Sequence, residues 1–295
     1  MSAITETAPI VAAPKTSKGY WASVFSRLVK DKVAMVALAV ILIIVLAAIF
    51  APYVAPADPF KGSMLRRLKP IGFPGYPLGG DELGRDMLSR LIYGGRLSLF
   101  MGVFPVLCAF VVGSGIGVFA GYAGGWINTV VMRIIDIFFA FPSVLLAIAL
   151  SGALGAGILN SIVSLTIVFI PPIARVAESV TTQIRTRDYV EAARVSGAGA
   201  FTIVRVHVLG NVLGPIFVFS TSLISVSMIL AAGLSFLGLG VKPPEAEWGL
   251  MLNTLRTAIY SQPMVAALPG FMIFLTSISF NLFSDGLRTA MEVKQ

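Results

Sequence analysis

Hydrophobic residues come in long blocks along this chain, and Gly/Pro-rich or charged breaks separate them. The first block, residues 33–57, contains no charged residue. Because an α-helix rises about 1.5 Å per residue, about 20 apolar residues cross a hydrocarbon core of about 30 Å. We therefore predict an all-α, polytopic membrane protein with six transmembrane helices, at residues 33–57, 97–120, 127–150, 158–174, 211–237 and 263–283.

Two long polar interruptions differ in character. Residues 56–96 are rich in Gly and Pro, which predicts a loop, with one short helix from Asp86 leading into the second span. Residues 178–210 lack proline and keep helical spacing throughout. The Lys/Arg bias of the short loops modestly favours a cytoplasmic N-terminus, and six crossings return the C-terminus to the same side. This orientation puts residues 56–96 outside and residues 178–210 in the cytoplasm.

The pattern divides the chain into four parts. Residues 1–32 are expected to form a cytoplasmic N-terminal tail, and residues 33–96 the first span with the external loop. Residues 97–286 are expected to form a five-helix core that includes the cytoplasmic loop 178–210, and residues 287–295 a cytoplasmic C-terminal tail. The first apolar block is too long, and too poor in a small-residue cleavage site, for a cleaved signal peptide.

Composition supports a membrane protein and excludes a nucleic-acid binder. Hydrophobic residues make up 57% of the chain and charged residues 12%, with a mean hydropathy of +0.90, whereas soluble domains carry about 25% charged residues. The net charge of +8 comes from basic residues spread between the apolar blocks. Such scattered charges orient membrane helices and do not form the basic stripe of a phosphate binder.

Several chemical signatures are missing from the sequence. No Gly-x4-Gly-Lys-Ser/Thr phosphate loop occurs, since residues 79–85 lack the lysine and the hydroxyl. Cys108 and His207 are each the only residue of their type, and no nucleophile motif is present. We therefore expect no enzyme activity, cofactor or metal site, and expect any ATP hydrolysis to be done by a partner. An ion-driven secondary transporter or a channel subunit stays open as the alternative, although Asp136 is the only acidic residue near a membrane interior.

One polar segment carries a candidate docking site. Asp188 can cap a helix while Glu191, three residues later, reaches back to the cap amide. Ala192 and Ala193 leave a helix face without bulky side chains, and Gly197 allows the left-handed turn that ends the helix. A second amphipathic stretch at residues 201–209 then leads back to the membrane. A short helix-turn-helix under the bundle is predicted, although a plain connecting loop is the ordinary alternative for so short a string.

The segment from Glu191 to Gly197 resembles the coupling-loop signature of permease subunits of ATP-binding-cassette importers. That signature continues to a Leu-Pro pair, which is Leu209-Gly210 here. Further stretches resemble the C-type permease of the subfamily that imports dipeptides, oligopeptides and nickel, and together they span nearly the whole chain. These are residues 77–90 (PLGGDELGRDMLSR), 121–126 (GYAGGW), 132–136 (MRIID), 140–142 (AFP), 235–241 (SFLGLGV), 247–249 (EWG) and 285–288 (DGLR).

The resemblance implies a type I importer permease fold in the bacterial inner membrane. It implies a second homologous permease subunit, two cytosolic ATP-binding subunits and an external solute-binding protein as partners. It further implies that the ATPases act through Asp188, Glu191, Ala192, Ala193 and Gly197. Peptides or similar small solutes are the cargo that it favours, but it does not single out one solute.

Two polar groups inside the predicted spans have alternative explanations. Arg133 and Asp136 lie one helical turn apart and can neutralise each other, either as a structural ion pair or as part of an inner gate. Hydroxyl and amide side chains in the fifth and sixth spans either line a wet pathway or mediate helix packing, and packing is favoured. They are Ser220, Thr221, Ser222, Ser225, Ser227, Thr276, Ser277 and Asn281.

Overall fold

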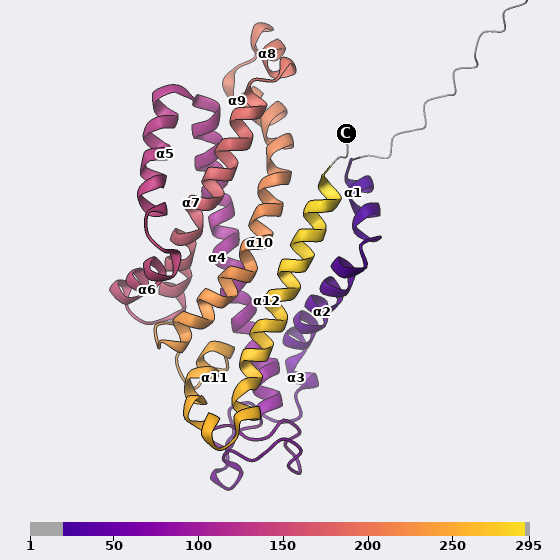
Figure 1. Ribbon diagram of the computed structural model, residues 1–295, viewed down its shortest axis with the longest axis vertical. Helices are drawn as coiled ribbons and strands as arrows, with labels where there is room; N and C mark the ends of the chain where they lie inside the picture. The colour runs from indigo at the N-terminus through magenta and orange to yellow at the C-terminus, as the bar shows by residue number, and fades with distance from the viewer. Residues whose placement is uncertain (1–19, 293–295) are drawn as a thin grey trace, which may run out of the picture.

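The computed structural model describes residues 20–292 and forms an elongated bundle of helices (Figure 1). The predicted tails therefore lie partly outside the described residues, at positions 1–19 and 293–295. Within the described range there is no β-strand, which agrees with the all-α prediction. The helices are α1 (Tyr20–Leu28), α2 (Lys32–Ile49), α3 (Ala51–Val54), α4 (Met87–Ala123), α5 (Gly125–Phe139), α6 (Ser143–Leu154), α7 (Ile158–Arg185), α8 (Asp188–Val195), α9 (Ala200–Ile203), α10 (Leu209–Phe236), α11 (Trp248–Thr254) and α12 (Pro263–Met291), with short turns η1 (Met64–Arg66), η2 (Val204–Val208) and η3 (Arg256–Tyr260).

Among residues 20–292, five helices are long and apolar enough to cross a membrane, and a sixth crossing is a bent pair. Helices α5 and α6 meet at an angle of 86°, so the single straight helix predicted for residues 127–150 is wrong. The break falls at Pro142, whose ring nitrogen carries no hydrogen and cannot continue the helical hydrogen-bond ladder. The predicted count of six holds when this bent pair is taken as one span.

The short helix predicted from Asp86 is confirmed, and it is continuous with the second span, which was predicted to begin at residue 97. Asp86 accepts a hydrogen bond from the Ser89 amide at 2.8 Å and caps α4, which then runs unbroken past residue 96, where a boundary was expected. The charged residues in this part of α4 pair with groups in other segments of the chain. The Arg90 guanidinium is buried 3.2 Å from Asp81, and Arg96 donates to the Ala48 carbonyl oxygen at 2.6 Å.

Glycines allow α4 and α7 to pack closely, and these two helices share the most extensive helix contact in the described part. Gly113, Gly117 and Gly121 recur every four residues along α4 and so lie on one face. A methyl group at Gly117 would collide with the Ala174 carbonyl oxygen and would lie 2.5 Å from the Ala177 Cβ. This close approach follows the small-residue rule for helix packing in membranes, where small side chains let backbones meet.

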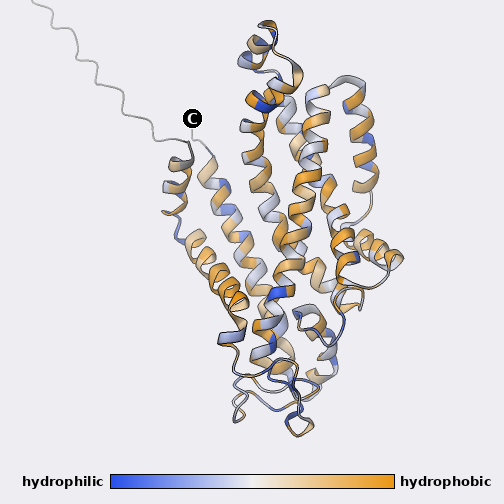
Figure 2. Ribbon diagram, turned by 180° about the vertical axis from the view of Figure 1, so that it is seen from behind, coloured by the Kyte–Doolittle hydropathy of each residue, from blue (hydrophilic) through white to orange (hydrophobic). Residues whose placement is uncertain are grey.

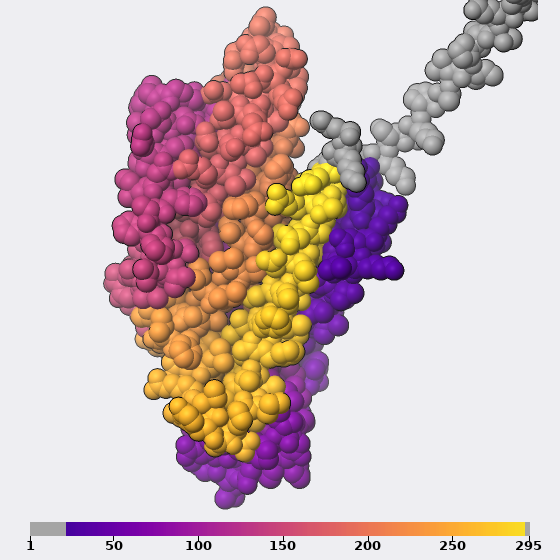
Figure 3. All heavy atoms as spheres, in the orientation of Figure 1, coloured from indigo at the N-terminus to yellow at the C-terminus, as the bar shows by residue number. Residues whose placement is uncertain are grey.

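The long helices surround a core made by α4, α7 and α10, while α2 and α12 lie at one side. Figure 3 shows α12 between α10 and the N-terminal helices on this face of the molecule, as their contacts require. Large apolar side chains on the outside of α2 are exposed, including Ile43 at 66%. In a bilayer these exposed side chains contact lipid, so an apolar outer surface is expected for a membrane protein.

The two ends of the bundle carry different polar structures. The hairpin of α8 and α9 projects at one end, where α1 and the end of α12 also lie, and the loop at residues 55–86 and helix α11 occupy the other end (Figure 1). Hydrophilic stretches gather in these end structures, and hydrophobic ones follow the helices between them (Figure 2). The axis of the bundle is therefore also the direction in which it crosses the membrane.

Candidate functional site

Helix α8 begins directly after the end of α7, with only two residues between them. Its N-cap residue is Arg187, and Asp188 is the first helical residue with no side-chain cap bond. The predicted capping box is thus wrong: the Glu191 carboxylate does not reach back to the cap but lies 3.6 Å from Arg194. Both acidic residues still lie in the first turn of α8, where their negative charge interacts favourably with the helix dipole.

Gly197 ends α8 in the way that the sequence predicts. Its φ of +81° is in the left-handed region, which side chains with a Cβ rarely adopt. The Gly197 amide donates to the Arg194 carbonyl oxygen and the Ala198 amide to the Ala193 carbonyl oxygen, both at 3.1 Å, the bonds of a Schellman turn. A Cβ here would meet no atom within 4 Å, so backbone conformation alone requires glycine.

The two alanines of α8 do not share one environment. Ala192 is exposed beside Glu191, whereas Ala193 is half-buried against the body of the protein. Val190 is fully buried in the same apolar cluster as Ile203 and Val208 of the following helical turns. The inner face of the hairpin is therefore part of the main apolar core of the bundle, and its outer face is free for a partner.

Exposed apolar side chains surround this outer face. The exposed fraction is 84% for Val195 and 61% for Val206, while Phe201, at 79%, borders an apolar groove beneath the hairpin. Sequence reasoning missed these residues, although a Phe and several Val in a polar loop are an available signal. An apolar surface on a hairpin that projects beyond the membrane helices fits contact with another protein.

The second half of the hairpin is continuous with a membrane helix. Residues 200–236 form one span, with a single π-helical turn, η2, between α9 and α10. The Leu-Pro pair of the resembling family is Leu209-Gly210 here, and glycine keeps the backbone amide that proline lacks. The hairpin is therefore joined without a break to α10, and to α7 by a link of two residues.

The charges of α5 make a different pair from the predicted one. Asp136 forms an ion pair with Arg175 of α7, and no ion pair joins it to Arg133 within the described chain. Met132 and Ile135 are the buried residues of α5. Asp136, four residues after Met132, lies on that packed side next to α7, while the Arg133 side chain is exposed.

Further polar contacts join α5 and α4 to α7 near the hairpin. The Asn128 side-chain amide donates to the Glu178 carboxylate at 2.6 Å, and the Thr182 hydroxyl donates to the same oxygen at 3.1 Å. The Arg185 guanidinium donates to the Tyr122 carbonyl oxygen at 3.3 Å. Helix α7, which leads into α8, is thus bonded to α5 through Glu178 and to α4 through Arg185.

Most hydroxyls of the fifth and sixth spans serve helix geometry and packing, as favoured from the sequence. Ser220 and Thr276 donate to carbonyl oxygens one turn earlier in their own helices, at 2.9 and 2.7 Å. Thr221 of α10 and Ser284 of α12 bond to each other at 2.9 Å. Such bonds satisfy the hydroxyls in an apolar medium.

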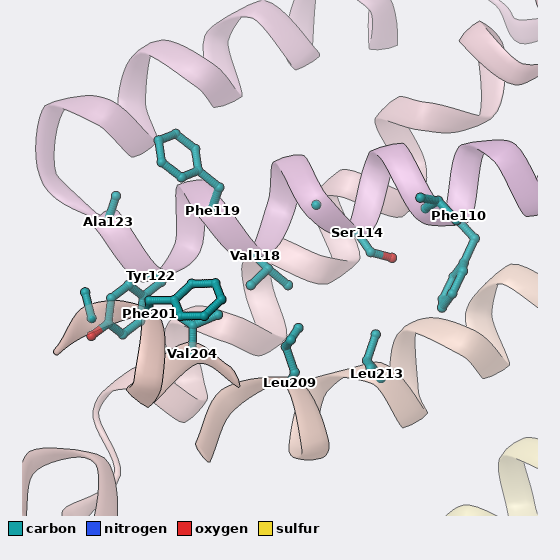
Figure 4. A pocket seen from close by; sticks show the side chains of 13 residues that line it. Phe110, Ser114, Val118, Phe119, Tyr122, Ala123, Phe201, Val204, Leu209 and Leu213 are labelled. Carbon is teal, nitrogen blue, oxygen red and sulfur yellow. The ribbon is translucent and has the colours of Figure 1, made fainter. Parts of the chain in front are cut away.

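A large apolar groove lies beneath the hairpin (Figure 4). It has a volume of about 780 Å³, and Phe110 and Val118 of α4 face Phe201, Leu209 and Leu213 across it. No charged side chain lines it. It therefore suits acyl chains or apolar side chains and offers no partner to a charged solute. In residues 20–292 there is also no cluster of three or more residues able to hold a metal ion.

An apolar bundle with a helical hairpin that is joined to two spans defines the class of multi-pass membrane proteins. Residues 113–294 match the family model of the binding-protein-dependent transport system inner membrane component. Residues 19–70 match the N-terminal TM domain of oligopeptide transport permease C.

Curated relatives cover nearly the whole chain. The glutathione transport system permease protein GsiD of Pectobacterium atrosepticum is 39% identical, with 99% of this chain and 97% of the relative aligned. The di/tripeptide transport system permease protein DppC of Pseudomonas aeruginosa is 40% identical, with 97% and 95% aligned. The dipeptide transport system permease protein DppC of Alkalihalophilus pseudofirmus is 38% identical, with 95% and 91% aligned.

The chain belongs to the family of inner membrane permease components of binding-protein-dependent transport systems. The prediction of a C-type permease subunit of an ATP-binding-cassette importer is confirmed, and the ion-driven alternative is not supported. The chain is accordingly a multi-pass inner membrane protein and a transport component, not an enzyme in its own right.

Proposed function

We propose that this chain forms half of the translocation pathway for peptides or similar small solutes and that a cytosolic ATPase holds its α8 hairpin. The observation that carries the proposal is the hairpin itself. Its first helix follows α7 directly, its second runs unbroken into α10, and its outer face is exposed and partly apolar. The relatives named for glutathione and dipeptide transport support peptides as the cargo.

The proposed assembly contains a second homologous permease, two cytosolic ATP-binding subunits and an external solute-binding protein. The hairpin, α1 and the end of α12 share one end of the bundle, which supports a cytoplasmic position for all three (Figure 1). The loop at residues 55–86 and helix α11 then face the binding protein.

In the proposed mechanism, ATP binding moves the hairpin and changes which end of the bundle is open. Asp188, Glu191 and Ala192 present charge and a small side chain to the ATPase, while Ala193 and Gly197 maintain the shape of the hairpin. A ligand shifts a conformational equilibrium only by the difference in its affinity for the two states. Nucleotide at the ATPases supplies that difference, because this chain contains no phosphate loop.

The test replaces two glycines near the same turn by valine, one in each variant. Gly197→Val places a β-branched side chain at φ +81°, which distorts the turn at a cost of about 1–3 kcal/mol. Gly199→Val is the matched control, since φ at Gly199 is −67° and no atom lies within 4 Å of its added Cβ. In proteoliposomes with all partner subunits, Gly197→Val is expected to abolish ATP-driven uptake or ATPase binding, and Gly199→Val to retain both.

Normal uptake by the Gly197→Val transporter would contradict the proposal. Vesicles that contain this chain alone, with an ion gradient and without ATP, test the ion-driven alternative. Accumulation of peptide in those vesicles would show that the chain needs no ATPase.

A further inference from the structure

A second cavity, between α10 and α12, differs from the apolar groove in its chemistry. Its volume is about 590 Å³, and Val176 of α7 forms part of its wall. Ser222 faces it from α10, and Asp285 and Arg288 face it from α12. At a rise of about 1.5 Å per residue, Asp285 lies about 9 Å before the end of α12, and Ser222 lies about 20 Å after the start of α10. Both of these helix ends are on the side of the bundle that carries the hairpin (Figure 1). The cavity thus occupies the half of the bundle nearest the hairpin.

The charged side chains of the cavity lie on one face of a membrane-spanning helix. Asp285, Arg288 and Glu292 are spaced by three and four residues, which puts them on the same side of α12. Arg288 lies 3.5 Å from Glu292, whereas no ion pair or hydrogen bond reaches the Asp285 carboxylate from any residue between 20 and 292. Charges in a span face water or a polar ligand because lipid contact is costly. Arg288 and Glu292 are 73% and 69% exposed, so the cavity is open to water or to a polar ligand.

The floor of the cavity is held in place by hydrogen bonds between the two helices. The Ser284 hydroxyl donates to the Val218 carbonyl oxygen at 3.2 Å and shares a 2.9 Å bond with Thr221. The volume falls within the range of about 300–1,000 Å³ that is usual for small-molecule sites. A dipeptide, at about 3.5 Å per residue, has charged ends about 7 Å apart, which side chains one helical turn apart can reach.

We propose that this cavity is a binding site for a short zwitterionic peptide on the inner half of the pathway. Asp285 binds the peptide ammonium group and Arg288 its carboxylate, while Phe219 and Val176 contact its apolar parts. This inference rests on the proposed function. It adds the location of the binding site and the direction in which the peptide lies there. The wall carries the Asp285 and Glu292 carboxylates and the Arg288 guanidinium, and charges of both signs favour a solute with both charges over a neutral or singly charged one.

The first experiment separates cargo binding from coupling. Asp285→Asn and Arg288→Gln are placed in the complete transporter in proteoliposomes, and dipeptide uptake and ATP hydrolysis are measured together. Each variant is expected to lose about tenfold in peptides moved per ATP, the size of one charge-assisted hydrogen bond, while the binding protein still stimulates hydrolysis. Thr289→Val is the control, because its hydroxyl bonds to its own helix at 3.0 Å and does not line this cavity.

An unchanged ratio of peptide to ATP in both variants overturns the inference, and so does a parallel loss of uptake and hydrolysis, which indicates a coupling defect. Neither result touches the proposed function, which fails only if the unaltered transporter shows no ATP-dependent uptake.

The second experiment tests whether the cavity is open in the assembly. Ser222→Cys is made in a Cys108→Ala background and treated with a charged, membrane-impermeant thiol reagent in inside-out vesicles of the complete transporter. Reaction that slows when dipeptide is added supports the site. Ile43→Cys on the lipid-facing side of α2 is the control and is expected to stay unreactive. An unreactive Ser222→Cys on both sides of the membrane means that the second permease fills the cavity, which overturns the inference.

Discussion

At the scale of single residues, charges in these helices pair according to helix packing and not according to sequence spacing. Arg133 and Asp136 stand at a spacing that permits an ion pair, yet Asp136 bonds to Arg175 of the neighbouring helix. The reason is directional, because Asp136 follows the packed side of α5 and Arg133 does not. A charge near lipid gains more from a partner on a packed helix than from one on its own exposed face.

The Asp136–Arg175 pair can be tested with a double-mutant cycle. Asp136→Asn and Arg175→Gln are each expected to lower the thermal unfolding midpoint of the detergent-solubilised transporter. The double variant Asp136→Asn with Arg175→Gln should lose less than the sum of the two single losses, with an interaction energy on the order of 1 kcal/mol. Arg133→Gln is the control and should leave the midpoint unchanged. Equal effects of Arg133→Gln and Arg175→Gln would show that Asp136 also pairs with Arg133.

Glu247 provides a prediction about pH at the opposite end of the bundle. It caps α11 by accepting hydrogen bonds from the amides of Gly249 and Leu250, both at 2.8 Å, and burial raises the pKa of its carboxyl above the ordinary value. The folded state therefore binds this proton more tightly than the unfolded state. Its contribution is favourable at low pH and is lost as pH rises from the ordinary pKa through the raised one.

Glu247→Gln removes the ionisable group, so the fall in stability across that pH window should become shallower. Thermal unfolding midpoints of the two proteins, measured side by side across the window, provide the comparison. The same slope in both would show that Glu247 does not contribute to it.

At the scale of elements, glycine spacing decides which helices can touch. Gly113, Gly117 and Gly121 allow α4 to approach α7, while Gly115 on the same helix has no atom within 4 Å of an added Cβ. The bent pair α5–α6 then follows α7 through Asp136 and Glu178. Helices α4, α5 and α7 therefore form one unit joined to the hairpin.

Gly117→Leu and Gly115→Leu make a matched pair for this packing. Gly117→Leu is expected to force α4 and α7 apart and to destabilise the protein by about 1–3 kcal/mol, as overpacking does. Gly115→Leu should be tolerated, since its side chain extends into open space. The yield of assembled, monodisperse transporter after detergent extraction measures both. Equal yields would show that close contact along α4 is not needed.

At the scale of the whole molecule, the hairpin lies at one end of the bundle and the loop at residues 55–86 at the other (Figure 1). The prediction is that the hairpin end faces the cytoplasm. Val195 in the hairpin and Leu65 in the loop at the other end are exposed by 84% and 87%. In a Cys108→Ala background, Val195→Cys should react with an impermeant thiol reagent only from the cytoplasmic side, and Leu65→Cys only from the outer side. Labelling of Val195→Cys from outside would remove the hairpin from the reach of any ATPase.

The sequence alone determined the class of the protein and the turn that ends helix α8. Uninterrupted apolar blocks require a membrane, because only a bilayer has room for so much apolar surface. Gly197 predicts its own turn, since its φ is a local property of the backbone. The order of motifs along the chain also identified the permease family before any packing was known.

The tertiary structure decided what depends on neighbours. The helix predicted from Asp86 continues into the second span as one helix, α4, in which Arg90 and Arg96 find partners in other segments. Asp136 has its partner on α7, and Ala193 turns inward while Ala192 turns out. Burial and ion pairing depend on which helices pack together, and a linear pattern of apolar blocks leaves that choice open because lipid and protein interiors are equally apolar.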